Sequence, residues 1–325
     1  MIALLFAAIL PGDERKNVEV SCPVDGHKFT AIEILSTNEW GGVDRDFCRH
    51  AYKTRPMELY IWVCPQCRFA GRKKDFETSI ASELKAKLKE GLKPGVPIRP
   101  AMKQPDIPGW VKYDLLAQTR SILGAPPEEI AKAHLSAAWC RRQEGAVFLE
   151  DFDEWERLWS SYNLHKTPLE LGKRNRTDHD LEIAKRVEKD IAAGRHKGLT
   201  LLLAQYLAAY LCRRHGENVE ALRWLGEVAR SKGENSVLDD AAKRMTTSIE
   251  EERAHQRRAL PLFESASTGS KLEKRAAGEL AYVLAETYRR LGERSKSIAW
   301  YDKALETSND EALKKLASDQ RALAQ

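Results

Sequence analysis

The spacing of apolar residues changes along the chain, from short alternating stretches near the start to helical periodicity in most of the remainder. Alternation over residues 28–35 predicts a strand, and the apolar run over residues 60–63 predicts a second, shorter one. Apolar residues at four-residue spacing predict a helix over residues 75–92, and from residue 111 onward there is essentially no strand signal. We therefore predict an α+β fold that is mainly α, with a small β module followed by a helical array.

Prolines and aromatic residues mark where the helical part is divided from the module. Five prolines lie between residues 94 and 108, where they remove backbone donors and predict an extended linker or a strap over the neighbouring domain. Beyond them an amphipathic stripe is formed by Phe148, Phe152, Trp155, Trp159 and Tyr162. The predicted organisation is an apolar segment at 1–17, a cysteine-containing β module with a trailing helix at 18–92, a proline-rich linker at 93–110 and a helical domain at 111–325.

One short phrase occurs three times in the helical part. Residues 135–142, 207–214 and 284–290 each combine small and aromatic residues with a final pair of arginines, and a glycine follows each within a few positions. The last copy, with its continuation to Leu305, resembles a tetratricopeptide repeat. Stacked hairpins of this kind form a concave surface, so we expect the helical domain to bind a protein or peptide. A helical bundle without a groove is the alternative.

The arginine pairs of this phrase are candidate partner-binding residues. They are Arg141, Arg142, Arg213, Arg214, Arg289 and Arg290. Side by side in a groove they could bind an acidic partner. Cations in the last turn of a helix also interact favourably with its dipole, and we prefer this second interpretation.

Charge and the apolar start of the chain limit the other partners and the location. The 325 residues carry 53 basic and 48 acidic side chains with the signs interspersed, a pattern that disfavours nucleic acid although Arg72, Lys73 and Lys74 are consecutive. Residues 2–10 are uniformly apolar, which resembles the core of a secretory signal and is too short to span a bilayer. We therefore favour export to the cell envelope over a cytoplasmic location and expect no transmembrane span.

Two cysteine-containing turns carry the clearest chemistry, but they do not match. Cys64-Pro-Gln-Cys67 is a complete metal-ligand pair, whereas its apparent counterpart reads Cys22-Pro-Val-Asp25. Two facing Cys-x-x-Cys pairs would specify a tetrahedral zinc site, and here one of the four ligands is an aspartate. We expect one structural zinc ion bound by Cys22, Cys64 and Cys67, with Cys48 or Asp25 as the fourth ligand. His27 and His50 are reserve candidates.

Two further interpretations of these cysteines stay open. The site could have lost its metal and the module could fold without it, or the thiols could be oxidised, with Cys64 and Cys67 acting as a redox pair. Redox pairs usually begin a helix in an α/β fold, whereas Cys64 follows a predicted strand and precedes a proline. This context favours a metal-binding turn. We find no other catalytic constellation in the sequence.

Several segments together resemble a bacterial family described as domain of unknown function 2225. They are residues 22–26, 46–48, 60–70 and 75–77. The resemblance implies a zinc-ribbon-like cysteine module joined to a helical, tetratricopeptide-like tail, with Cys22, Cys48, Cys64 and Cys67 as the family's cysteines, and it implies no reaction. Asp25 stands where the family has a cysteine. Arg68 stands where it has a glycine, so a strained or different turn is expected there.

These observations favour a non-enzymatic binding or assembly protein, in which a zinc-stabilised module is tethered to a helical domain that recognises a protein or peptide. The second hypothesis is a thiol-disulfide or metal-dependent enzyme that uses Cys64 and Cys67. The third is a zinc-ribbon nucleic-acid binder.

Overall fold

The computed structural model describes residues 13–38, 41–51, 54–145, 149, 153–164, 176–231, 233, 235–269 and 272–324. The apolar segment at residues 2–10 lies outside the described residues, as do Phe148 and Phe152 of the predicted aromatic stripe. Among the helices that are described, none combines the length and the apolar character needed to cross a membrane.

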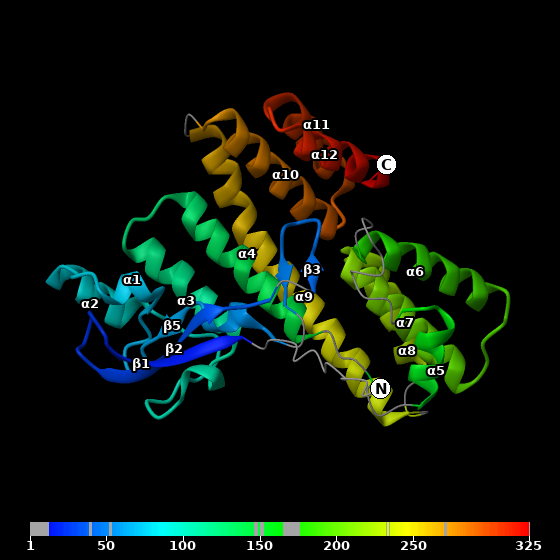
Figure 1. Ribbon diagram of the computed structural model, residues 1–325, viewed down its shortest axis with the longest axis horizontal. Coiled ribbons are helices and arrows are strands. Elements are labelled where there is room, and N and C mark those ends of the chain that lie inside the picture. The colour runs from blue at the N-terminus through cyan, green and yellow to red at the C-terminus, as the bar shows by residue number, and fades with distance from the viewer. Residues whose placement is uncertain are drawn as a thin grey trace, which may run out of the picture.

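The fold is α+β and mainly α, as the sequence predicts (Figure 1). The strands are β1 (Glu14–Ser21), β2 (Lys28–Ser36), β3 (Gly42–Val43), β4 (Arg49–His50), β5 (Trp62–Val63) and β6 (Ala70–Gly71). The helices are α1 (Lys73–Phe76), α2 (Ser82–Gly91), α3 (Gly109–Ile122), α4 (Pro127–Glu144), α5 (Asp153–Ser161), α6 (Arg176–Ala192), α7 (Leu199–His215), α8 (Asn218–Arg230), α9 (Ser236–Gly269), α10 (Lys274–Arg290), α11 (Arg294–Thr307) and α12 (Glu311–Ala324). Two 3₁₀ turns cover Pro56–Leu59 and Gln104–Asp106.

The β module consists of three antiparallel strand pairs, β1 with β2, β3 with β4 and β5 with β6. Phe76 contacts Phe29, Trp62 and Phe69, so one aromatic cluster connects β1–β2 to β5–β6. The helix expected over residues 75–92 is divided into α1 and α2. Phe76, the last residue of α1, packs into this cluster, and the chain is extended at Ala81 before α2 begins.

The module shares one hydrophobic core with α3 and α4, and the proline-rich stretch lies over that core. Ile98 and Ile107 of the stretch are buried in it. The Gln104 side chain accepts a hydrogen bond from the backbone N–H of Val63 and donates one to the Val63 carbonyl, as a neighbouring strand would. Residues 93–108 therefore form a strap across β5.

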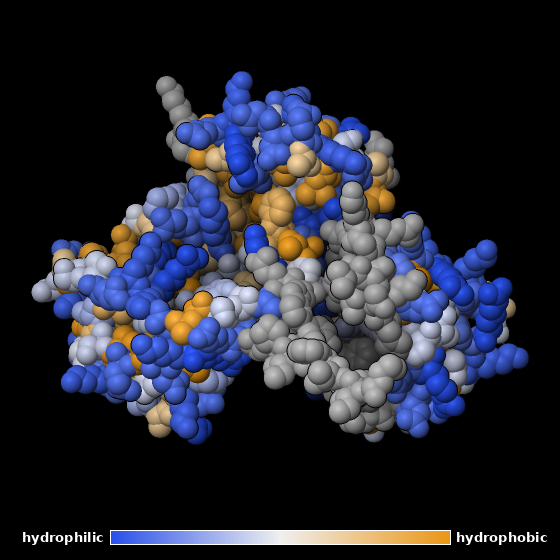
Figure 2. Space-filling view, in the orientation of Figure 1, coloured by the Kyte–Doolittle hydropathy of each residue, from blue (hydrophilic) through white to orange (hydrophobic). Residues whose placement is uncertain are grey.

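The remaining helices form two groups around the long helix α9 (Figure 1). Helices α5 to α8 share a core with the first half of α9, and α10 to α12 pack on one another beside its second half. Helix α4 lies along α9, and the β3–β4 hairpin reaches the place where the groups meet. The outer faces of the groups are largely hydrophilic, whereas hydrophobic side chains gather toward the centre (Figure 2).

The repeated sequence phrase corresponds to the ends of α4, α7 and α10. Gly145, Gly216 and Gly292 follow these helices, and the latter two have the positive φ angles, 96° and 80°, that end a helix in the left-handed conformation. The arginine pairs therefore occupy the last turn of three helices, and the small residues before them let neighbouring helices approach closely.

Candidate metal centre

Two short turns position the cysteines of the candidate site. After β1, the backbone N–H of Cys22 donates to the carbonyl of His27 at 2.9 Å, and Gly26, with φ of 75°, closes the turn. Within this turn the N–H of His27 donates to Asp25 Oδ1 at 3.0 Å, which fixes the carboxylate. Asp25 is therefore held in the position that the second cysteine of a knuckle would occupy.

The second turn follows β5 and has the same hydrogen-bond pattern. The N–H of Arg68 donates to the Cys64 carbonyl at 2.8 Å, and the N–H of Cys64 donates to the Phe69 carbonyl at 2.9 Å. Arg68 has a φ of 69°, so it adopts the left-handed conformation that a glycine would take here. The sequence leaves open a strained residue or a different turn at this position. The structure keeps the turn, and Arg68 is strained at a cost of about 1 kcal/mol.

The two turns face each other and bring four potential ligands together. Sγ of Cys22 lies 3.5 Å from Sγ of Cys67, and Sγ of Cys64 lies 3.7 Å from both Asp25 carboxylate oxygens. One ligand atom from each residue lies within 4.8 Å of the others. Tetrahedral zinc with Zn–S bonds of about 2.3 Å requires sulfur atoms about 3.8 Å apart, so the donor set fits this ion.

The electrostatics of the group favour a cation. The three cysteines are reduced and buried. Hydrogen bonds from Cys22 and Cys67 lower the pKa of Cys64 to about 2, and the interaction with Cys64 raises the pKa of Cys22 to about 12. Interactions with Cys22 and Cys64 raise the pKa of Cys67. Without a cation, Cys64 is thus the thiolate, and Cys22 and Cys67 remain protonated beside it. A bound divalent cation would stabilise all three as thiolates.

The other candidates for the fourth ligand lie elsewhere. Cys48 is buried on the β3–β4 hairpin in a separate group with Asp44 and His50. Burial raises the pKa of the Cys48 thiol. His27 stacks on Phe29 and is not part of the cysteine group. The geometry therefore brings Asp25, rather than Cys48, to the three cysteines.

The family described as an uncharacterized protein conserved in bacteria (DUF2225) matches residues 16–249. The chain belongs to the DUF2225 family. The match covers the whole cysteine module and continues through α8 into α9. No curated protein and no solved structure matches the chain.

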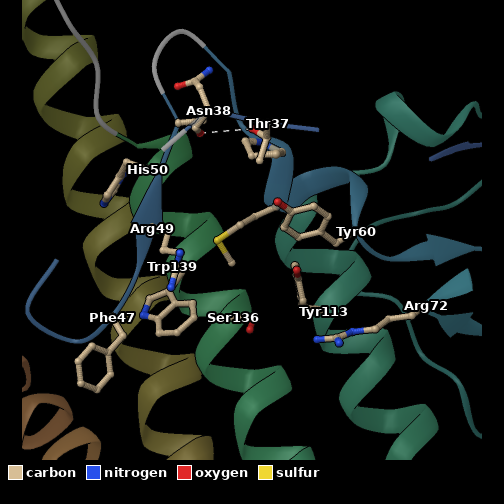
Figure 3. A pocket seen from close by; sticks show the side chains of 13 residues that line it. Thr37, Asn38, Phe47, Arg49, His50, Tyr60, Arg72, Tyr113, Ser136 and Trp139 are labelled. Atoms are coloured by element: carbon tan, nitrogen blue, oxygen red, sulfur yellow. Dashed lines mark hydrogen bonds between the residues drawn. The ribbon is translucent and has the colours of Figure 1, made fainter. Parts of the chain in front are cut away.

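A cavity of about 250 Å³ adjoins the β3–β4 hairpin of this DUF2225 protein (Figure 3). Its walls include His50 of the hairpin and the aromatic rings of Tyr60, Tyr113 and Trp139. Cys48 lies beside His50 and Asp44, the three residue types of a Cys-His-Asp catalytic triad. Its side chain, however, does not line the cavity. A buried thiol with a raised pKa is a poor nucleophile, so this group does not support a cysteine-dependent reaction.

The β3–β4 hairpin also carries two aspartates at the centre of the molecule, which the sequence analysis did not single out. Arg142 donates to Asp44 at 2.6 Å, to Asp46 at 2.7 and 2.9 Å, and to Glu252 at 2.7 and 2.9 Å. Nε of Arg290 lies 3.3 Å from Asp46. We call this set, Asp44, Asp46, Arg142, Glu252 and Arg290, the ionic centre. It joins the module to α4, α9 and α10.

The arginine pairs of the repeated phrase thus bind carboxylates of the chain itself. Arg142, Arg213, Arg289 and Arg290 are buried. Arg289 pairs with Glu286 and Glu217, and Arg213 lies 3.8 Å from Glu252. The two partly buried members, Arg141 and Arg214, pair with Glu251 and Asp180. Their main role in this structure is to connect helix ends, not to form an exposed basic surface.

Proposed function

We propose that this protein is a non-enzymatic assembly protein, in which one structural zinc ion stabilises a zinc-ribbon-like module and a tetratricopeptide-like helical body recognises a protein or peptide. The observation that carries the zinc part is the closed group formed by Cys22, Asp25, Cys64 and Cys67. A structural zinc ion has four protein ligands, whereas a catalytic zinc ion keeps one position open. With four donors from two turns, the group favours the structural role.

The position of the group explains what a zinc ion would stabilise. Cys22 and Asp25 come from the turn after β1, and Cys64 and Cys67 come from the turn after β5. An ion bound by both turns would cross-link the β1–β2 and β5–β6 strand pairs, in addition to the aromatic cluster around Phe76. Small domains commonly draw much of their folding free energy from such an ion.

The helical body supports the assembly part of the proposal. Helices α10 and α11 form a hairpin in which Ser297, Tyr301 and Ala304 of α11 are buried, the packing expected of a tetratricopeptide-like pair. The cavity beside β4, with its aromatic walls, offers a place for an apolar side chain of a bound peptide.

Metal analysis combined with a thiol count tests the zinc site. We expect about one tightly bound zinc ion, no disulfide, and loss of the ion in Cys64→Ser. Cys140→Ser is the matched control, because Cys140 is equally buried but lies in α4, outside the cysteine group. Protein without metal that forms a reversible Cys64–Cys67 disulfide would contradict the proposal and favour the thiol-disulfide enzyme.

A second pair of variants identifies the fourth ligand. Asp25→Ala should weaken zinc binding by tenfold or more, whereas Cys48→Ser should leave it unchanged, because Asp25, unlike Cys48, lies within 4.8 Å of the three sulfur atoms. The reverse order of effects would show that the hairpin rearranges to bring Cys48 to the metal.

Peptide recognition is tested by affinity capture with two exposed apolar positions as a matched pair. Tyr60 borders the cavity and Leu323 lies on α12, and their exposed fractions are 41% and 44%. We expect Tyr60→Ala to lose a specifically captured protein that Leu323→Ala retains. Capture that is equal for both variants would exclude the cavity as the recognition site.

A further inference from the structure

A second group of metal-binding side chains lies outside the cysteine module, where three helices meet. Asp114 comes from α3, His134 from α4 and His255 from α9. Nδ1 of each histidine lies 3.8 Å from Oδ1 of Asp114, and the three ligand atoms lie within 4.8 Å of one another. Because each residue stands on a rigid helix and the helices pack together, the arrangement is fixed by the fold (Figure 1).

The Nδ1 atoms of the two imidazole rings point toward Asp114 but form no hydrogen bond with it. A distance of 3.8 Å is too long for a hydrogen bond. Both Nδ1 atoms are buried, and neither has a hydrogen-bond partner among the described residues. His255 is only 4% exposed. A buried polar atom without a partner is costly, so two of them directed at one carboxylate call for an explanation.

The charge state of the rings suits a metal ligand. Burial lowers the pKa of His255 to about 4, and burial also lowers the pKa of His134. Burial thus favours the neutral form of both rings, and a neutral imidazole has the free lone pair that binds a metal ion. An aspartate oxygen supplies the negative charge that such an ion favours.

A cavity of about 430 Å³ opens beside the group. Asp114 and His255 form part of its wall, together with Trp110, Arg141 and Arg258. The cavity gives an ion access to the group and leaves space for water or a small ligand at further coordination positions. Two histidines and one carboxylate with open positions form a donor set used by zinc and by non-haem iron(II).

We propose that Asp114, His134 and His255 form a second metal site, which binds a divalent transition-metal ion with open coordination positions toward the cavity. The site is independent of the proposed structural zinc ion, since it uses nitrogen and oxygen donors from different elements. Gln118 donates to Oδ2 of Asp114 at 2.9 Å and orients the carboxylate, as neighbours of metal ligands commonly do.

Arg258 opposes metal binding at this site. Its Nη1 donates to Oδ1 of Asp114 at 2.9 Å, so the guanidinium occupies the oxygen that would bind the ion and adds an unfavourable positive charge. The Arg258 side chain is 56% exposed and can turn into solvent. Loss of this arginine should therefore strengthen metal binding, an effect that a purely structural ion pair would not produce.

Cobalt(II) titration of the purified full-length protein, with the cysteine group already loaded with zinc, tests the proposal. We expect one further cobalt ion, with visible absorption but no thiolate-to-cobalt charge-transfer band. His255→Gln should weaken this binding at least tenfold, and Arg258→Gln should strengthen it several-fold. His196→Gln is the control and should bind as the wild type does, because His196 lies outside the group.

Three results would overturn the second site. One is the absence of cobalt binding by the wild-type protein, and another is a charge-transfer band, which would place the cobalt in the cysteine group. The third is unchanged or weaker binding by Arg258→Gln. That variant changes an exposed side chain and should fold normally, so the test does not depend on the stability of the buried histidine variants. The first and third results would not bear on the zinc content of the cysteine group, whereas the charge-transfer band would show that cobalt had taken the place of zinc there.

Discussion

Replacing Arg142 with alanine removes the guanidinium that three buried carboxylates share. Asp46 and Glu252 are at most 1% exposed, and Asp44 is 7% exposed, so the substitution leaves three buried carboxylates without this partner. The five charged hydrogen bonds of Arg142 would sum to about 8–15 kcal/mol at about 1.5–3 kcal/mol each. The net loss is smaller, because the cost of burying the guanidinium disappears with it and Arg290 remains nearby. Removal of one partner from a buried ion pair costs about 3–5 kcal/mol, and we expect a loss in this range.

Urea unfolding of Arg142→Ala and Arg141→Ala measures this effect, with the free energy of unfolding taken from the midpoint and slope. Arg141 is the adjacent residue and pairs with Glu144 and Glu251 nearer the surface, so its loss should cost only about 1 kcal/mol. Equal losses for the two variants, or a loss below about 1 kcal/mol for Arg142→Ala, would refute the view that the ionic centre stabilises the joined module and helices.

Two further predictions concern the β3–β4 hairpin and the end of α7. Burial opposes protonation of His50, but Asp44 outweighs it and raises the His50 pKa to about 10, above its ordinary value of about 6.5. The resulting stabilisation is complete below about pH 6.5 and is lost as the pH rises through 10, so the melting temperature should fall over this window in the wild type and less in His50→Asn. An equal fall in both would contradict this assignment. Gly216 has a φ of 96°, and an added Cβ would lie 2.7 Å from Cζ of Arg290, so Gly216→Ala should cost more than about 1 kcal/mol. Gly226, which lies inside α8 with open space around it, is the control. Gly226→Ala should instead stabilise the protein by about 0.5–1 kcal/mol. Unfolding measurements that rank the two substitutions in the opposite order would contradict the prediction.

The features that the sequence predicts are those that local chemistry determines. The alternation over residues 28–35 corresponds to β2, because the side-chain period of a strand is visible in the sequence itself. The turn at Cys64–Cys67 is likewise local, since its hydrogen bonds join residues at most five positions apart. Gly216 and Gly292 mark real helix ends for the same reason, because a left-handed residue ends a helix wherever it occurs.

The features that the sequence does not predict depend on pairings between distant residues. Whether Asp25 or Cys48 lies beside the other cysteines depends on the β3–β4 hairpin, which carries Cys48 toward the ionic centre instead of the module turns. The hairpin is held there by Arg142, about a hundred positions further along the chain. A pair of arginines at a helix end has the same appearance in a sequence whether it is exposed or buried, so the ionic centre is visible only in the fold.

The proposed zinc ion, bound by three cysteines and one aspartate, is tested most directly by zinc K-edge X-ray absorption. The measurement is best made on the His255→Gln variant, in which the second site is removed. We predict one zinc ion per chain with three sulfur ligands at about 2.3 Å and one oxygen ligand at about 2.0 Å. Absence of zinc, a shell of four sulfur atoms, or a shell of nitrogen and oxygen atoms alone would contradict the account.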